Sequence, residues 1–371
     1  MNPFASLSAY PATADRLLRE LAVIPAPTGQ ETQRIAFCQH FLEENGFSKA
    51  FTDAVGNLIL PFGDIENGPL DVFAAHADVV FPDMEALPWS EDETFIRCPG
   101  IGDNTAHVAA LLMTALALKD REPQEGGVLI VINVAEEGLG NLKGSRQLMA
   151  DYGDRMRSFV TLDSIFPEVV TTAVGSCRYR ISVKTEGGHS FRDYGKTNAA
   201  ERLAALIEKL YSEPLPSRGR TTRNVGIIEG GTSVNTIAED AAMLFEYRSD
   251  DREDLAEACR QLEKAAEALR SEDCAITVTL IGERPCGRET DPVVFDRMKQ
   301  RAMALVRQYY HEEPFENAGS TDANAALAAG VPALCFGACR GGGVHTREEW
   351  IRKDSLLPGL CLAYDLVAEL F

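Results

Sequence analysis

Three short, almost uninterrupted apolar segments constrain the fold most strongly. They cover residues 71–75, 127–135 and 158–162, and helical apolar spacing occurs before and between them at 13–23, 31–45, about 105–119 and about 142–152. Strands that are apolar at every position are typical of a sheet with helices on both faces. The pattern therefore predicts an α/β fold with a mixed, mostly parallel sheet covered on both sides.

The middle of the chain has a different order of elements. Strand patterns at 178–185, 223–229, 237–247 and 275–283 are interleaved with helix patterns at 198–213 and 252–271. This βαββαβ order is typical of a ferredoxin-like unit that folds on its own. Helices at 291–311 and 354–370 and a strand at 332–337 then resume the first pattern. We expect residues 1–174 and 286–371 to form one domain, and residues 175–285 to be inserted in it.

The charge and the cysteines limit the partners and the environment. The 371 residues have a formal net charge of −20, which argues against nucleic acid or an anionic membrane as partner because both bind basic surfaces. The longest apolar stretches, such as 108–118, are too short to cross a bilayer, and the first residues have no signal-peptide pattern. Nine cysteines without a Cys-x-x-Cys pair indicate reduced thiols, so we expect a cytoplasmic protein.

Acidic and imidazole side chains follow the predicted strands of the outer domain. His76 and Asp78 come after residues 71–75, the pair Glu136-Glu137 comes after 127–135, and Asp163 comes after 158–162. The carboxyl ends of strands in an open α/β sheet are where ligands gather. The sequence therefore predicts that these side chains share one edge of the sheet.

Two further candidates lie in loops. Asp103 follows Gly100-Ile101-Gly102 at the start of a predicted helix, and His345 follows the glycines at 341–343. Each candidate alone has a plainer explanation: a helix N-cap for Asp103, a turn residue for Asp163, a structural histidine for His76 or His345, and a solvated corner for the glutamate pair. Together, converging carboxylates would repel one another, and a bound cation relieves this repulsion.

Two imidazoles and several carboxylates are ligands that suit zinc, and cobalt and manganese share these preferences. Two such ions that share a carboxylate polarise a carbonyl group and activate water, while one carboxylate stays free as a general base. Cys335, Cys339 and His345 are an alternative ligand set. Cys335 is better explained as a small buried strand residue, so this alternative is weaker.

At these positions the chain resembles the di-zinc metallopeptidase family M20, which includes peptidase T, glutamate carboxypeptidase, aminoacylase and succinyl-diaminopimelate desuccinylase. The motifs extend over nearly the whole chain in the right order: His-x-Asp at 76–78, Gly-x-x-Asp at 100–103, Glu-Glu at 136–137, Asp-Ser at 163–164, Gly-Gly-His-Ser at 187–190, and a late histidine at 345. Jointly these motifs are specific, although each is common alone. Segments 319–324 and 341–346 look most like the peptidase-T-like branch.

The resemblance implies five metal ligands. His76 and Asp163 would bind one ion, Glu137 and His345 the other, and Asp103 would bridge the two.

Two neighbouring acids have other implied roles. Asp78 would orient His76, as partners of metal-bound imidazoles do. Glu136 would be the general base that moves a proton from water to the leaving amine. Glu349, four residues after His345, also fits the family's pattern.

For the inserted domain, the resemblance implies a lid that also forms a homodimer interface. His189 matches a lid histidine that reaches a neighbouring active site and stabilises the oxyanion. Asn235 matches a residue near the substrate carboxylate, and Arg248, after a strand at 243–247, matches the arginine that binds this carboxylate. The plainer alternatives are a turn histidine for His189 and a surface salt bridge for Arg248.

We expect an aminopeptidase or di/tripeptidase with two divalent metal ions, most simply zinc. The alternative is an N-acyl amino acid amidohydrolase, which would share the amide bond, the metals and Arg248. The segment Asp103-Asn104-Thr105 stands where the family often has Asp-Asp-Lys or Asp-Met-Lys, so substrate assignments based on it do not carry over. A silent peptide-binding relative is disfavoured because Glu136 and every ligand are present. A serine hydrolase is disfavoured because Gly-x-Ser-x-Gly is absent.

Overall fold

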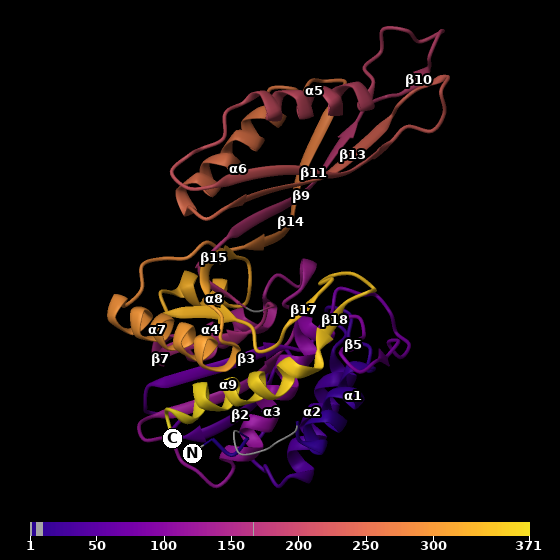
Figure 1. Cartoon of the computed structure of the whole chain (residues 1–371). Coiled ribbons are helices and arrows are strands. Elements are labelled where there is room, and N and C mark those ends of the chain that lie inside the picture. Colours follow the sequence, from indigo (N-terminus) through magenta and orange to yellow (C-terminus); the bar gives the residue numbers. More distant parts are fainter. Residues whose placement is uncertain (1, 5–9, 166) are drawn as a thin grey trace. The chain divides into compact units, whose positions relative to one another are not determined.

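The computed structural model describes residues 2–4, 10–165 and 167–371, and the chain divides into two units. Unit 1 comprises Met1–Ala173 and Arg288–Phe371, and unit 2 comprises Val174–Gly287 (Figure 1). These boundaries lie within two residues of the domain boundaries proposed from the sequence.

The core of unit 1 is a mixed eight-stranded sheet. In chain order its strands are β1 (Phe51–Thr52), β2 (Leu58–Gly63), β3 (Leu70–His76), β6 (Gly127–Asn133), β7 (Met156–Leu162), β8 (Glu168–Ala173), β15 (Phe315–Gly319) and β16 (Ala333–Phe336). They are arranged as β1-β2-β6-β3-β7-β16-β8-β15, and the four central strands β6, β3, β7 and β16 are parallel. Strands β3 and β6 are buried at every position, so the prediction of a two-sided, mostly parallel sheet is confirmed.

Helices cover both faces of this sheet. They are α1 (Ala12–Ala22), α2 (Thr32–Glu44), α3 (Ala106–Leu118), α4 (Lys143–Tyr152), α7 (Pro292–Tyr310), α8 (Ala323–Ala329) and α9 (Leu356–Ala368), with short helices η1 (Ile101–Thr105), η2 (Gly138–Gly140), η3 (Gly153–Arg155) and η4 (Lys353–Ser355). Helices α1, α2, α3, α7 and α9 enclose the larger apolar core on one face, and α4 and α8 pack on the other face (Figure 1).

A second small sheet in unit 1 holds a loop of the candidate site. Its strands are β4 (Ser90–Glu91), β5 (Phe95–Arg97), β17 (Gly341–Gly342) and β18 (Trp350–Arg352), arranged as β17-β18-β5-β4. His345 lies in the loop between β17 and β18, so the pairing of these strands fixes both ends of its loop.

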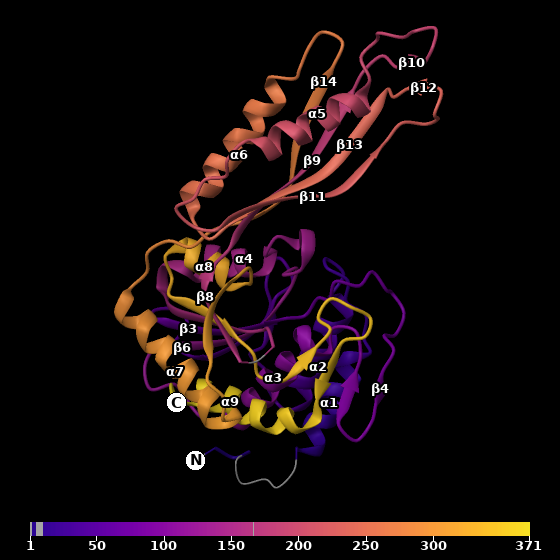
Figure 2. The same cartoon turned by 45° about the horizontal axis from the view of Figure 1, so that its top comes forward.

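Unit 2 has the predicted βαββαβ order. Its elements are β9 (Gly175–Lys184), α5 (Ala199–Ser212), β11 (Thr221–Gly230), β13 (Asp240–Ser249), α6 (Arg252–Glu267) and β14 (Ala275–Arg284), with the short pair β10 (Gly188–His189) and β12 (Thr236–Ile237). The antiparallel sheet has the order β11-β13-β9-β14, and α5 and α6 pack on one of its faces (Figure 2). Both helices begin at a side-chain cap, Asn198 for α5 and Asp251 for α6.

Several elements differ from the sequence patterns. Strands β2, β8 and β15 were not predicted; β2 contains a proline, and β15 reads Phe-Glu-Asn-Ala-Gly with no apolar run. The strand predicted at 237–247 is two strands, β12 and β13, and β13 continues to Ser249. Arg248 therefore lies within a strand rather than after one. The helix predicted at 252–271 already ends at Glu267.

Two structural facts bear on the expected environment. Among the described residues, one helical stretch, Ile101–Leu118, is long and apolar enough to cross a membrane, and 83% of it is buried inside the protein. It packs against α1 and α9 as a core helix, which accounts for its apolar sequence.

All nine cysteines lie in the described parts of the chain, and all are free thiols.

Candidate metal centre

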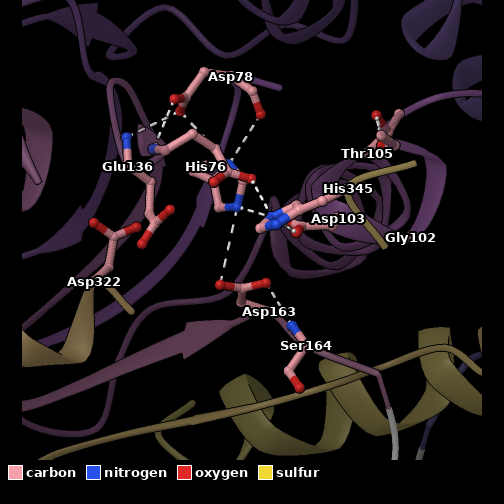
Figure 3. Close-up of polar contacts among 12 residues, drawn as sticks. His76, Asp78, Gly102, Asp103, Thr105, Glu136, Asp163, Ser164, Asp322 and His345 are labelled. Carbon is pink, nitrogen blue, oxygen red and sulfur yellow. Dashed lines mark hydrogen bonds and ion pairs between the residues drawn. The ribbon is translucent and has the colours of Figure 1, made fainter. Parts of the chain in front are cut away.

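The carboxyl ends of three adjacent parallel strands bring the predicted residues of unit 1 together. Strand β3 ends at His76, Glu136 and Glu137 follow β6, and Asp163 follows β7 (Figure 3). Since β6, β3 and β7 are neighbours with parallel register, their ends necessarily meet at one edge.

Asp103 lies between the two imidazoles. His76 Nε2 is 2.9 Å from Asp103 Oδ1, and His345 Nε2 is 3.0 Å from Asp103 Oδ2 (Figure 3). His345 Nε2 is also 3.1 Å from Glu137 Oε1, and Asp163 Oδ2 is 3.9 Å from His76 Nε2. Five side chains from separate parts of the chain thus form one connected cluster.

Burial and mutual contact shift the protonation of this cluster. Burial and the negative charge of Asp103 raise the pKa of Asp163 to about 7. Hydrogen bonds to Asp103 and Glu137 raise the pKa of His345 to about 10. Burial opposes a charged His76, but its contacts with Asp103 and Asp78 raise its pKa well above the ordinary value. The neighbouring carboxylates therefore favour positive charge on both imidazoles.

The turn that carries Asp103 is held from the C-terminal part of the chain. Glu349 accepts hydrogen bonds from the backbone N–H groups of Gly100, Gly102 and Asp103 at 2.8–2.9 Å. Asp103 has non-helical angles (φ −117°, ψ 85°), and helix α3 has no side-chain cap. The N-cap explanation for Asp103 is therefore wrong, because its carboxylate faces the two histidines instead.

Asp78 organises two neighbouring segments. Its carboxylate accepts hydrogen bonds from the backbone N–H groups of Glu136 and Glu137 at 3.0 and 2.9 Å. His76 Nδ1 lies 3.0 Å from the backbone oxygen of Asp78 and 3.5 Å from its carboxylate. The fully buried Asp78 carboxylate thus holds the glutamate pair as closely as it holds His76.

Three non-glycine residues at the centre have positive φ angles: Ala135 (55°), Ser164 (76°) and His345 (62°). Side-chain-bearing residues rarely adopt this conformation, and it costs free energy. His345 is itself a candidate ligand, Ser164 directly follows the candidate ligand Asp163, and Ala135 directly precedes the candidate base Glu136. Three of the six non-glycine residues with positive φ among the described parts of the chain therefore lie at the candidate centre; the others are Asn141, Leu142 and His311.

Asp322, at the start of α8, belongs to the site although it was not singled out from the sequence. Its carboxylate is fully buried, faces Glu136 and accepts a hydrogen bond of 2.6 Å from Asn133 (Figure 3). Burial raises the pKa of Asp322. In the sequence, segment 319–324 indicated only a branch of the family. The alanine-rich helix that follows Asp322 could have indicated that this aspartate is buried.

The candidate residues of unit 2 lie in two places: His189 and Asn235 at the separate β10–β12 pair, and Arg248 in the four-stranded sheet. His189 in β10 pairs with Thr236 in β12, and Ser190 N donates to Asn235 O, so His189 and Asn235 are close together and exposed. Arg248 lies near the end of β13, where Ser176 and Thr222 are its neighbours, and its Nε is 3.0 Å from Glu246 Oε1.

The cluster of unit 1 fits a metal site by its donor set. Ligand atoms of His76, Asp103 and Glu137 lie within 4.8 Å of one another, and these side chains are largely buried. Three carboxylates and two imidazoles in contact are a set that divalent cations bind. This group contains no cysteine, and the buried thiol of Cys335 instead donates to the backbone oxygen of Asp163 at 3.5 Å.

A family model described as peptidase family M20/M25/M40 matches residues 72–369, which is most of the chain. The chain belongs to this family. As a member of family M20 it is a hydrolytic enzyme, and the resemblance seen in its motifs is confirmed.

Relatives of this M20 protein include succinyl-diaminopimelate desuccinylases. The one from Ruegeria pomeroyi is 28% identical over 270 residues, covering 66% of this chain and 69% of the relative. The one from Cereibacter sphaeroides is 25% identical over 368 residues, covering 92% and 94% of the two chains.

Solved structures with the same fold include peptidases. A tripeptidase from Staphylococcus aureus has a TM-score of 0.77 at 20% identity and covers 96% of this chain and 97% of its own. Aminopeptidase PepT from Bacillus cereus has a TM-score of 0.75 at 21% identity, with 96% and 98% covered. The YXEP protein of Bacillus subtilis, described as a dinuclear metal binding peptidase, has a TM-score of 0.68 at 15% identity, with 96% and 98% covered.

Proposed function

We propose that this M20 hydrolase is a di-metal exopeptidase that cleaves the amide bond of di- and tripeptides. One observation carries the proposal: His76, Asp103, Glu137 and His345 converge within hydrogen-bond distance at the end of the central sheet. Asp163, 3.9 Å from His76, completes the donor set. The similarity to a tripeptidase and an aminopeptidase supports small peptides as substrates.

In this proposal the five residues hold two divalent cations, with zinc the best match to two imidazoles and three carboxylates. His76 and Asp163 would hold one ion, Glu137 and His345 would hold the other, and Asp103 would be shared by both. When bound, the ions polarise the amide carbonyl and lower the pKa of water. The dinuclear centre described for the Bacillus subtilis protein supports the count of two.

The chain's own groups then move the proton and orient the reactants. Glu136 takes a proton from the attacking water and delivers it to the nitrogen of the leaving amine. Asp78 keeps Glu136 and Glu137 in place through its two backbone hydrogen bonds. Arg248 binds the substrate carboxylate. Asn235 and His189 lie together beyond the other end of β13, so in this proposal they serve the site of the second chain in the homodimer, where His189 donates a hydrogen bond to the oxyanion and Asn235 contacts the carboxylate.

Unit 2 is proposed to act as the lid and as the interface of a homodimer. Strand β11 is an edge of the unit 2 sheet, since it pairs with β13 alone. It exposes Ile227 and Ile228 by 52% and 63%. An exposed apolar edge strand favours pairing with another strand, and a second copy of this chain offers the same edge. The free cysteines support a reducing compartment, such as the cytoplasm.

The second candidate function is an N-acyl amino acid amidohydrolase. It is favoured by the similarity to desuccinylases, which extends over nearly the full length of the Cereibacter sphaeroides relative. Both reactions break an amide bond beside a carboxylate, so the same metal centre and the same Arg248 serve either substrate.

The test is a substrate panel. Zinc-loaded protein is incubated with free di- and tripeptides and, in parallel, with N-acetyl and N-succinyl amino acids, and released amines are quantified. We expect cleavage of at least one peptide class and its loss after removal of the metal with a chelator. Cleavage of acylated amino acids alone would overturn the peptidase proposal in favour of the second candidate. Fewer than one bound ion per chain after zinc reconstitution would contradict both.

A further inference from the structure

The first turn of helix α2 carries two buried charged side chains without an assigned role. Glu31 is 5% exposed and Arg34 is fully buried. Burying an ionised group costs free energy unless hydrogen bonds or opposite charges compensate. Their partners therefore indicate what the two side chains stabilise.

Arg34 has no carboxylate within 4.0 Å among the described residues. Its guanidinium instead donates to the backbone oxygen of Ala77 at 3.0 Å, to the Thr105 hydroxyl at 3.3 Å and to the backbone oxygen of Ile24 at 2.7 Å. Ala77 lies between His76 and Asp78, and Thr105 is two residues after Asp103. One side chain thus joins two segments that carry candidate ligands.

Glu31 reaches a third segment. Its Oε1 accepts hydrogen bonds from the N–H groups of Gly29 at 2.6 Å and Ala135 at 3.1 Å. Ala135 has a φ of 55° and immediately precedes Glu136-Glu137. The Glu31 carboxylate therefore stabilises an unfavourable backbone conformation at the residue that aims the glutamate pair.

We propose that Glu31 and Arg34 are positioning residues of the metal centre, and that the first turn of α2 sets the spacing of its ligands. This inference rests on the proposed function. The ligands come from segments far apart in sequence, and metal affinity depends on holding them within a fraction of an ångström. A helix that binds all three segments through fixed hydrogen bonds supplies this constraint.

The experiment measures zinc dissociation constants by chelator competition for the wild type, Glu31→Ala and Arg34→Lys. We expect each variant to bind zinc at least about tenfold more weakly, as is usual when partners behind metal ligands are lost. Glu31→Ala should weaken mainly the ion held by Glu137 and His345. Arg34→Lys keeps the charge, but a single ammonium group cannot reach Ala77, Thr105 and Ile24 together, so the ion at His76 should bind more weakly.

Three controls separate positioning from general stability. Glu31→Gln retains an oxygen acceptor for Ala135 N and should bind zinc nearly as the wild type does. Glu43→Ala removes an exposed partner of Gln39 on the same helix and should leave zinc affinity unchanged. If Arg34→Lys does not fold, Thr105→Val is compared with Thr105→Ser, which retains the hydroxyl; only the valine variant should lose affinity.

The outcomes are distinct. If Glu31→Ala and Arg34→Lys lower the unfolding temperature of the metal-free protein but keep wild-type zinc affinity, the two residues are merely structural and the inference is wrong. If both folded variants bind zinc like the wild type and are equally stable, it is also wrong. If the wild type itself binds no zinc, the proposed function fails first.

Discussion

Asp103 is the candidate ligand that contacts both imidazoles of the cluster. It touches His76 through one carboxylate oxygen and His345 through the other, at 2.9 and 3.0 Å. Neighbouring positive charge lowers the pKa of Asp103 despite its burial. Two carboxylate oxygens directed to two imidazoles suit the bridging role that the family resemblance implies for Asp103.

In the proposed mechanism, Glu136 is needed for turnover but not for metal binding. Replacing Glu136 by Gln removes the proposed proton carrier but retains a side chain of the same shape beside the candidate ligands. We expect zinc content to stay at the wild-type level and kcat to fall by about 10²–10⁴-fold, the usual contribution of a general base. Metal analysis and steady-state kinetics on the same preparation check both. A variant with near-wild-type kcat would show that another group carries the proton.

At the scale of elements, three of the candidate ligands lie at or just after strand ends, whereas Asp103 and His345 lie in a turn and a loop. Helix α3 contacts the segment that leads from β16 to β17, before the His345 loop. His107 is fully buried in this helix, and its Nε2 accepts a hydrogen bond of 2.9 Å from the backbone N–H of Ala338, just after β16. Burial lowers the pKa of His107 to about 4, so it is neutral at physiological pH.

Replacing His107 by Phe should destabilise metal-free protein at pH 7.5 by about 1–3 kcal/mol, because the Ala338 N–H loses its acceptor. The unfolded chain protonates a histidine below about pH 6.5, whereas the native one resists until about pH 4. The wild type therefore loses this contribution as the pH falls through that window, and the stability gap to His107→Phe should shrink at pH 5. Urea unfolding at both pH values measures the gap; an unchanged gap would contradict a neutral buried His107.

At the scale of the whole molecule, unit 1 contains all proposed metal ligands and the base, while unit 2 contains His189, Asn235 and Arg248. Each unit has its own apolar core. The proposed function therefore draws its groups from both units. In the proposed homodimer, the chain that supplies His189 to each site can be tested.

Mixed dimers of Glu136→Gln and His189→Ala chains provide the test. If His189 serves the partner's site, a mixed dimer has one site with an intact Glu136 and an intact His189, and about half of the wild-type activity returns. Co-expressed, differently tagged chains are purified as mixed dimers and compared with each parent variant. His189→Ala alone should lose rate but retain zinc. Mixed dimers no more active than the parents would place His189 in its own chain's site, and a monomeric protein would overturn the dimer.

Much of this fold could be predicted from local patterns of apolar residues in the sequence. The βαββαβ order of unit 2 and the buried strands β3, β6 and β7 follow from apolar periodicity, because burial on one or both faces dictates which positions are apolar. Strands such as β15 and β2 were missed because neighbouring strands, rather than their own residues, stabilise them. A helix N-cap was the plainer explanation of Asp103 in the sequence, but contacts with Glu349 hold a non-helical turn there instead.

The sequence by itself determined the class of fold, the family and which side chains are candidates for the chemistry, since these depend on residue types and their order. Only the tertiary structure decided how those groups meet. Asp78 binds the Glu136-Glu137 backbone, Asp322 faces Glu136, and Arg34 joins Ala77 to Thr105. Such contacts join residues far apart in the chain. They form because a buried polar group is removed from water and needs a hydrogen-bond partner within the same protein.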